Sequence, residues 1–145
     1  MGEITERWKS EECRIEDGIY FEDDTYIALL GHAAAQGARR SIGELLHCEP
    51  DNWSAICVGD PLAVSPDYLV FGGETSWEGA GFLAVVRARD GSLIWLLHSS
   101  EAEPFRCAGI AGELVVATSH AYPVSLRWEI PIAAPWSLTV TAGAV

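Results

Sequence analysis

The sequence predicts an α+β domain, mainly β, in which a curled antiparallel sheet of about seven strands is packed by one helix. Three observations carry this prediction: a hairpin signal at Asp90-Gly91, an alternating segment at residues 124–130, and helix formers within residues 31–48. The chain has 145 residues, a length that favours a single domain over residues 1–145. A chain of this size buries about two-thirds of its surface on folding, so we expect a sizeable core.

The first predicted strands lie near the N-terminus, in residues 20–21 and 25–30. Aromatic and β-branched side chains are frequent in both segments, and such residues favour strands. The polar run Glu22, Asp23 and Asp24 separates the two segments and has the composition of a turn. We therefore expect a short hairpin with these three acids at its tip.

Residues 31–48 contain the predicted helix. Alanine and leucine side chains recur there at intervals that suit a helix, and helix formers dominate the segment. Gly37 disfavours helical structure, and Pro50 prevents the helix from continuing. We expect one helix here, interrupted at Gly37.

The rest of the chain has the pattern of strands joined by tight turns. Asp90-Gly91, between two apolar runs, is the strongest short-range signal of a β-hairpin, and Ala111-Gly112 marks a second hairpin. In residues 124–130 apolar and polar side chains alternate, which places them on opposite faces of a sheet. The predicted strands are residues 53–58, 68–71, 81–89, 92–99, 105–110, 113–119, 124–130 and 136–141.

The chain is strongly acidic. It has nine Lys and Arg against 21 Asp and Glu, a net charge of -12. Binding to nucleic acid requires a basic face that displaces counterions, so this charge argues against a nucleic-acid partner. It argues equally against docking on an anionic membrane. A basic macromolecular partner, or a role of the charge in solubility alone, remains.

The N-terminal segment MGEITERWKSEECRIEDG is charged and has no apolar run of a secretory signal. Every apolar stretch is shorter than the roughly 20 residues that a membrane-spanning helix needs. We therefore expect a cytoplasmic protein. The four cysteines have no C-x-x-C spacing, and we expect them to be small buried hydrophobic residues without disulfides: Cys13, Cys48, Cys57 and Cys107.

The motifs of common enzymes and cofactor sites do not occur in the sequence. The glycine-rich residues 72–81 lack the order of a phosphate-binding loop, and Glu74 and Glu78 within them would repel phosphate. The nucleophile motif G-x-S-x-G is missing, and the four histidines lack the spacing of metal ligands. We expect a protein without enzymatic activity, metal or cofactor.

Two acidic segments are the candidate partner surface. Trp77 lies between two acids in a glycine-rich connection, and an aromatic side chain ringed by charge is typical of a binding hot spot. A solvated acidic face and a mobile connection are the alternative interpretations of the two segments. The predicted partner-binding residues are Glu22, Asp23, Asp24, Glu74, Trp77 and Glu78.

The run GGETSWEGAGFLAVVRARDGSLIWLLHSSEAEPF from Gly72 to Phe105, with Tyr122-Pro123 and Trp128-Glu-Ile-Pro, resembles immunity proteins of bacterial polymorphic and contact-dependent toxin systems. The resemblance implies a cytoplasmic, non-enzymatic inhibitor that binds one toxin domain. Such families share no active motif, so no residue role is carried over. The acidity is compatible, because a nuclease toxin needs a basic site that carboxylates can occlude.

Three other function classes stay open. Six tryptophans could line a small-molecule pocket, although more often they fill the core of a curled sheet. The chain could also be an accessory subunit of a larger assembly, with a flat apolar face, or an enzyme of an unrecognised class. The sequence carries no signal for the oligomeric state.

Overall fold

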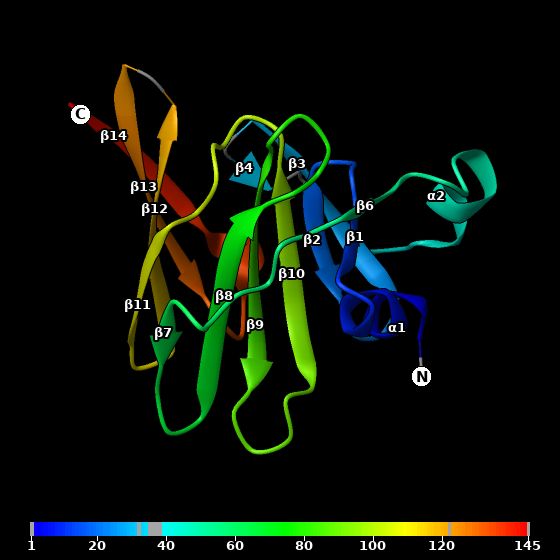
Figure 1. Cartoon of the computed structure of the whole chain (residues 1–145), viewed down its shortest axis with the longest axis horizontal. Coiled ribbons are helices and arrows are strands. Elements are labelled where there is room, and N and C mark those ends of the chain that lie inside the picture. Colours follow the sequence, from blue (N-terminus) through cyan, green and yellow to red (C-terminus); the bar gives the residue numbers. More distant parts are fainter. Residues whose placement is uncertain (1, 32, 35–38, 122, 145) are drawn as a thin grey trace.

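The fold is mainly β and antiparallel, as predicted, in a computed structural model of the chain. The structure describes residues 2–31, 33–34, 39–121 and 123–144. Within these residues the strands form one large sheet, a four-stranded sheet and a two-stranded ribbon. Figure 1 shows the four-stranded sheet on one side of the large sheet and the ribbon with helix α1 on the other.

The large sheet is the centre of the molecule. Seven of its described strands follow one another in the order β4-β3-β2-β10-β9-β8-β7, and β5 also pairs with β3. All of these pairs are antiparallel. Their bounds are β2 Gly18–Phe21, β3 Thr25–Leu30, β4 Ala33–Ala34, β5 Arg40–Ser41, β7 Ala63–Val64, β8 Tyr68–Glu74, β9 Gly81–Arg87 and β10 Leu93–Ser99.

The C-terminal strands form the four-stranded sheet, in the order β11-β12-β13-β14, instead of extending the large one. The two sheets pack face to face through one apolar cluster, in which Trp95 and Leu97 of β10 join Trp128 and Ile130 of β13. The bounds are β11 Cys107–Ala111, β12 Leu114–Ala121, β13 Val124–Pro131 and β14 Thr139–Ala144, with a 3-10 helix at Pro135–Ser137.

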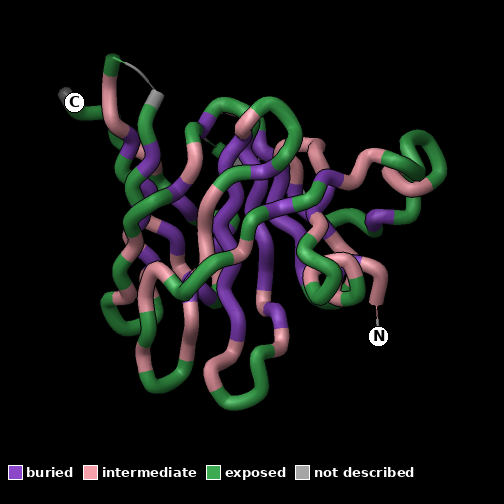
Figure 2. Tube along the Cα trace, in the orientation of Figure 1, coloured by how far each residue is buried: buried purple, intermediate pink, exposed green. Residues whose placement is uncertain are grey.

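A second apolar cluster covers the opposite face of the large sheet. Ile4 of helix α1 (Glu3–Lys9) and Cys13 of strand β1 (Glu12–Arg14) pack there against Tyr20, Phe82 and Leu96. Strand β1 pairs with β6 (Trp53–Ala55). Because the central strands are buried on both faces, β9 is a continuous apolar run rather than an alternating one. Figure 2 shows the buried residues concentrated along these strands.

The predicted hairpins are confirmed. Strands β9 and β10 pair antiparallel across Asp90-Gly91, where Gly91 has a φ of 72° and Asp90 accepts a hydrogen bond from the Ser92 amide. Strands β11 and β12 pair across Gly112, whose φ is 64°. The acidic run after Phe21 is the predicted turn between β2 and β3. Positive φ values are the conformation that such tight turns require.

The helix expected over residues 31–48 is wrong for much of that segment. Among the described residues of this segment only Gly43–Cys48 is helical (α2). None of its residues is fully buried, but Leu45 and Leu46 pack, partly buried, against the second apolar cluster. Ala33–Ala34 and Arg40–Ser41 instead pair with β3 as strands. Residues 32 and 35–38, with the expected break at Gly37, lie outside the described residues. Pairing with the free edge of β3 has overridden local helix propensity here.

Candidate functional site

The structure places the two predicted acidic segments at opposite ends of the large sheet. Glu22 follows Phe21, which pairs with Trp95 near the start of β10. Glu74 pairs with Gly81, which itself pairs with Ser99 at the end of β10. The two segments therefore do not form one continuous surface.

The acids of the β2–β3 turn are engaged in intramolecular contacts. Glu22 receives two hydrogen bonds from Arg87, at 2.8 and 2.9 Å, and this contact raises the pKa of the guanidinium. Asp23 pairs with Arg39 at 3.1 Å. Burial alone would raise the pKa of the Asp23 carboxyl, but hydrogen bonds with Thr25 and the charge of Arg39 lower it.

Asp24 is occupied as well, because its carboxylate binds the backbone at the start of α1. Its two oxygens accept hydrogen bonds from the amides of Glu3 and Ile4. A partner that used the three acids of this turn would have to break these contacts. The turn is thus a weaker candidate than the opposite end of the sheet.

The connection between β8 and β9 presents the predicted anchor. The side chain of Trp77 is 39% exposed, and its ring centroid lies 6.5 Å from that of buried His98. The buried Thr75 hydroxyl donates to the Trp77 carbonyl at 3.1 Å, and the Thr75 amide donates to Ala80. This loop therefore has internal hydrogen bonds that fix the position of Trp77.

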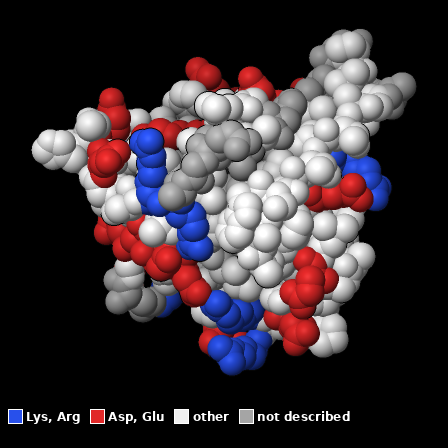
Figure 3. Space-filling view, turned by 180° about the vertical axis from the view of Figure 1, so that it is seen from behind, with Lys and Arg blue, Asp and Glu red and all other residues white. Residues whose placement is uncertain are grey.

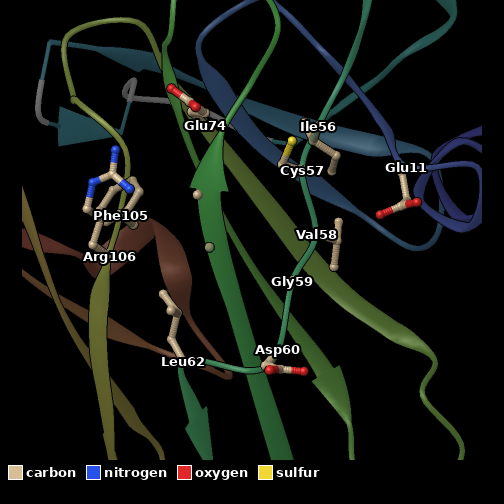
Figure 4. A pocket seen from close by; sticks show the side chains of 12 residues that line it. Glu11, Ile56, Cys57, Val58, Gly59, Asp60, Leu62, Glu74, Phe105 and Arg106 are labelled. Carbon is tan, nitrogen blue, oxygen red and sulfur yellow. The ribbon is translucent and has the colours of Figure 1, made fainter.

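A groove lies beside this loop, along the outer edge of β8, with a volume of about 600 Å³. We call it the β8 groove. Figure 1 shows the connection from β6 to β7 passing over β8, and Figure 4 shows that this connection forms one wall and the segment before β11 the other. The residues that line it are Glu11, Ile56, Cys57, Val58, Gly59, Asp60, Leu62, Gly72, Gly73, Glu74, Phe105 and Arg106.

The floor of the β8 groove is formed by the outer edge of strand β8. Segment 55–57 covers β8 at one end, where the Cys57 amide donates to the Glu74 carbonyl. At the other end the Leu62 amide donates to the Val70 carbonyl. Between these contacts, no hydrogen bond joins Gly72 to the covering segment anywhere in the described part of the chain. The groove therefore contains a short gap in the pairing of β8.

The charge of the groove is mostly negative. The exposed carboxylates of Glu11, Asp60 and Glu74 form no ion pair or side-chain hydrogen bond with any described residue, and Arg106 is the one cation among the lining residues. The face of the molecule in Figure 3 differs from the groove in charge, because Lys and Arg (blue) lie there beside Asp and Glu (red). The groove thus offers carboxylates that intramolecular contacts leave available.

Sequence reasoning found Glu74 but missed Glu11, Asp60 and Arg106. They come from three separate segments: the turn after α1, the β6–β7 connection and the approach to β11. Glu11 has a φ of 57°, which a non-glycine residue seldom adopts. No local pattern shows that these segments converge, because their proximity depends on the packing of the large sheet.

A polar cluster around buried His98 underlies the Trp77 loop. Nδ1 of fully buried His98 lies 3.1 Å from Oδ1 of Asp17. The same oxygen accepts a hydrogen bond from the Ser100 amide, and Oδ2 accepts one from the Ser100 hydroxyl. Burial alone would raise the pKa of Asp17, but the hydrogen bonds from His98 and Ser100 lower it. The cluster joins β2 to β10 and has the character of a structural contact.

No group of three His, Cys, Asp or Glu side chains among the described residues is arranged to hold a metal ion. The four cysteines are free thiols, but the expectation that they are buried is wrong for Cys48, Cys57 and Cys107, which are exposed. Cys13 is buried, and this burial raises the pKa of its thiol to about 12. Cys57 is exposed and lines the β8 groove.

The tryptophans divide between core and surface. Trp95 and Trp128 are fully buried, whereas Trp77 and Trp136 are the exposed ones among the described residues. Trp95 and Trp136 line a second pocket, of about 280 Å³, together with Arg39. The Arg39 guanidinium lies 3.6 Å from the centre of the Phe21 ring in the same pocket.

Comparison with known proteins gave no match to a protein family, to a curated protein or to a solved structure. Within the described residues, no helix has both the length and the apolar character needed to cross a membrane.

Proposed function

We propose that this chain is a non-enzymatic, acidic binding protein of the bacterial cytoplasm, which neutralises a cognate basic toxin domain of the nuclease type by occluding its active site. The observation that carries the proposal is that Glu11, Asp60 and Glu74 line the β8 groove at separate places and form no ion pair with any described residue. Trp77, in the connection that follows Glu74, supplies an apolar contact.

The charge supports a basic partner. A nuclease must hold phosphate groups with Lys and Arg side chains, and a protein of net charge -12 is attracted to such a site. Opposite charges raise the association rate, which matters when a toxin has to be neutralised before it acts. Carboxylates already paired within the chain, such as Glu22 with Arg87, contribute less to this attraction.

Trp77 supports a specific interface. Buried aromatic side chains contribute much of the binding energy at protein interfaces. The side chain of Trp77 is partly exposed while its loop is fixed by Thr75, so little conformational freedom is lost on binding. Glu74 and Glu78, which form no ion pair with any described residue, flank it and provide a polar rim.

The experiment has two steps. A tagged copy of the chain is used to purify its partner from the native host, and the partner is then assayed for nuclease activity with increasing amounts of the chain. We expect a basic protein whose nuclease activity falls to zero at a one-to-one ratio. An acidic partner, or nuclease activity that persists at saturation, would overturn the proposal.

The same assay tests the anchor. Trp77→Ala should weaken binding by about 2 kcal/mol or more, which is a roughly 30-fold increase in Kd. Trp136→Ala is the matched control, because Trp136 is similarly exposed, at 43%, and its ring packs near Phe21 at the other end of the large sheet. Equal affinities of the two variants would place the interface elsewhere.

The second pocket favours one other candidate function, the binding of a small molecule. Trp136 offers an exposed ring and Arg39 a cation in the same cavity. Benzoate, which has a ring and a carboxylate, is a suitable probe. Quenching of tryptophan fluorescence by benzoate that is lost in Trp136→Ala would support this function, and unchanged fluorescence would contradict it.

A further inference from the structure

We propose that a small buried cavity beside Arg14 binds one water molecule, which accepts hydrogen bonds from the guanidinium of Arg14 and from the indole of Trp53. We call it the Arg14 cavity. None of the residues that line it also lines the β8 groove. The site is therefore independent of the proposed function.

The guanidinium of Arg14 has one nitrogen that no described residue binds. The side chain is fully buried, and its Nε and Nη2 donate to the two carboxylate oxygens of Glu16 at 2.8 and 2.6 Å. Nη2 also donates to the Glu49 carbonyl. Nη1 is buried as well, but it has no hydrogen-bond partner among the described residues. A buried N–H without an acceptor destabilises the folded state, and more so in a charged group.

Trp53 has a second donor of this kind. It pairs with Arg14 across strands β1 and β6, so the two side chains lie on the same face of the ribbon. The Arg14 Cζ lies 5.0 Å from the centre of the Trp53 ring. The indole Nε1 is buried, and no described residue accepts its proton. Guanidinium and indole nitrogens only donate hydrogen bonds, so both groups need an acceptor.

Arg14 and Trp53 line the same cavity, which has a volume of about 10 Å³. A space of this size holds one water molecule when polar groups are there to bind it. Ile4 of α1, Tyr20 of β2 and Leu96 of β10 also line the cavity, so it lies where α1 and the ribbon pack on the large sheet. A water oxygen accepts two hydrogen bonds and can satisfy both donors at once.

Water suits the cavity better than an anion does. The carboxylate of Glu16 already balances the charge of Arg14. Glu12 also lines the cavity, and its carboxylate, which pairs with Arg7 at 3.1 Å, would repel an anion. A chloride ion is also larger than a water molecule, whereas the cavity has room for one water.

The first test is a high-resolution crystal structure of the full chain, with a second crystal soaked in sodium bromide. We expect one density peak within about 3.2 Å of both Nη1 of Arg14 and Nε1 of Trp53, without anomalous signal from bromide. A bromide signal at this position would identify an anion site. A cavity without a peak would mean that the two donors remain without an acceptor. Either result would overturn the inference.

The second test detects the water in solution by NMR of the ¹⁵N-labelled full chain. The Trp53 indole N–H, assigned by its loss in Trp53→Phe, should show an NOE to water that is opposite in sign to the rotating-frame effect, because a buried water stays bound for longer than the protein takes to tumble. The fully buried Trp95 indole is the matched control, since it donates to the Ile132 carbonyl at 3.0 Å and should show no such signal.

One variant excludes a signal that reaches Trp53 through an exchanging hydroxyl. Tyr20→Phe removes the hydroxyl of a residue that lines the cavity, and the NOE from water to the Trp53 indole should persist in this variant. Loss of the NOE in Tyr20→Phe would assign it to the hydroxyl and overturn the inference. Equal NOEs at Trp53 and Trp95, or none at Trp53, would overturn it as well.

Discussion

The carboxylate of Asp24 caps helix α1 from 20 residues away along the chain: its Oδ1 accepts a hydrogen bond from the Ile4 amide at 3.0 Å. Its other oxygen accepts from the Glu3 amide at the same distance. Gly2, at the N-cap position of the helix, has no side chain to satisfy these amides. The turn between β2 and β3 therefore fixes the start of α1 on the face of the large sheet.

Asp24→Ala should destabilise the protein by about 1 kcal/mol, the usual cost of losing a helix cap. The midpoint of urea denaturation measures this change. Asp51→Ala is the control, because Asp51 is exposed and forms no side-chain hydrogen bond with described residues. Equal midpoints for the two variants would show that the cap contributes nothing.

The Asp17–His98 contact predicts how stability depends on pH. The folded-state pKa of Asp17 is lowered, so its contribution is present above the unfolded pKa of about 3.9 and is lost as the pH falls through the folded value. Asp17→Asn should cost about 1–3 kcal/mol at neutral pH and should weaken the dependence of stability on pH below about pH 4. Urea denaturation across this range measures both effects.

Ser100→Ala is the control for this pH dependence, since it removes one hydrogen bond and keeps the carboxyl that titrates. The wild type and Ser100→Ala should both lose stability as the pH falls. Parallel pH profiles for the wild type and Asp17→Asn would show that Asp17 is not the titrating group.

Gly72 should not tolerate a side chain. A Cβ there would lie 2.8 Å from Cδ1 of Leu62 and 3.1 Å from Cβ of Phe105, so packing on the core side of β8 would have to shift. Gly72→Ala should cost about 1–3 kcal/mol, the usual cost of overpacking. Gly109→Ala is the control, because a Cβ at Gly109 meets no atom within 4 Å. The midpoints of urea denaturation measure the stability lost in each variant. Equal losses in Gly72→Ala and Gly109→Ala would refute the packing argument.

The thiols should differ in reactivity. Cys13 is buried with a pKa of about 12, so it should react with a thiol reagent only after unfolding. Cys57 is exposed in the β8 groove and should react in the folded protein. Mass spectrometry of briefly labelled protein identifies the modified residues. Early labelling of Cys13 would mean that the packing of β1 on the large sheet opens readily.

Local sequence patterns predicted the hairpins well, because Asp90-Gly91 contains the residues that its turn requires. The fold class followed from such pairs and from the alternation in β13, where Leu126, Trp128 and Ile130 are buried. The division of the strands into two packed sheets could not be predicted, because alternation shows that one face of a strand is buried but not which other element buries it. Helix α1 was missed because part of its stabilisation comes from Asp24, which is distant in sequence.

The candidate site was predicted only in part. Glu74 and Trp77 lie in one glycine-rich segment whose composition indicates an exposed connection. By contrast, the composition of the β2–β3 turn suggested free acids, but Glu22 pairs with Arg87, 65 residues away. Glu11 and Asp60 join Glu74 only through the packing of separate segments. Ion pairs between residues distant in sequence determine which carboxylates stay available to a partner, and no local sequence pattern indicates these pairs.

The most direct test of the central claim is the affinity of the purified partner for two triple variants. One changes the groove acids, Glu11→Gln, Asp60→Asn and Glu74→Gln, and the other changes exposed acids outside it, Glu6→Gln, Glu49→Gln and Asp51→Asn. Surface plasmon resonance should show at least a tenfold higher Kd for the groove variant, mainly from slower association and less marked at high salt. The control should stay within twofold of the wild type. Equal affinities of the two variants would contradict the account.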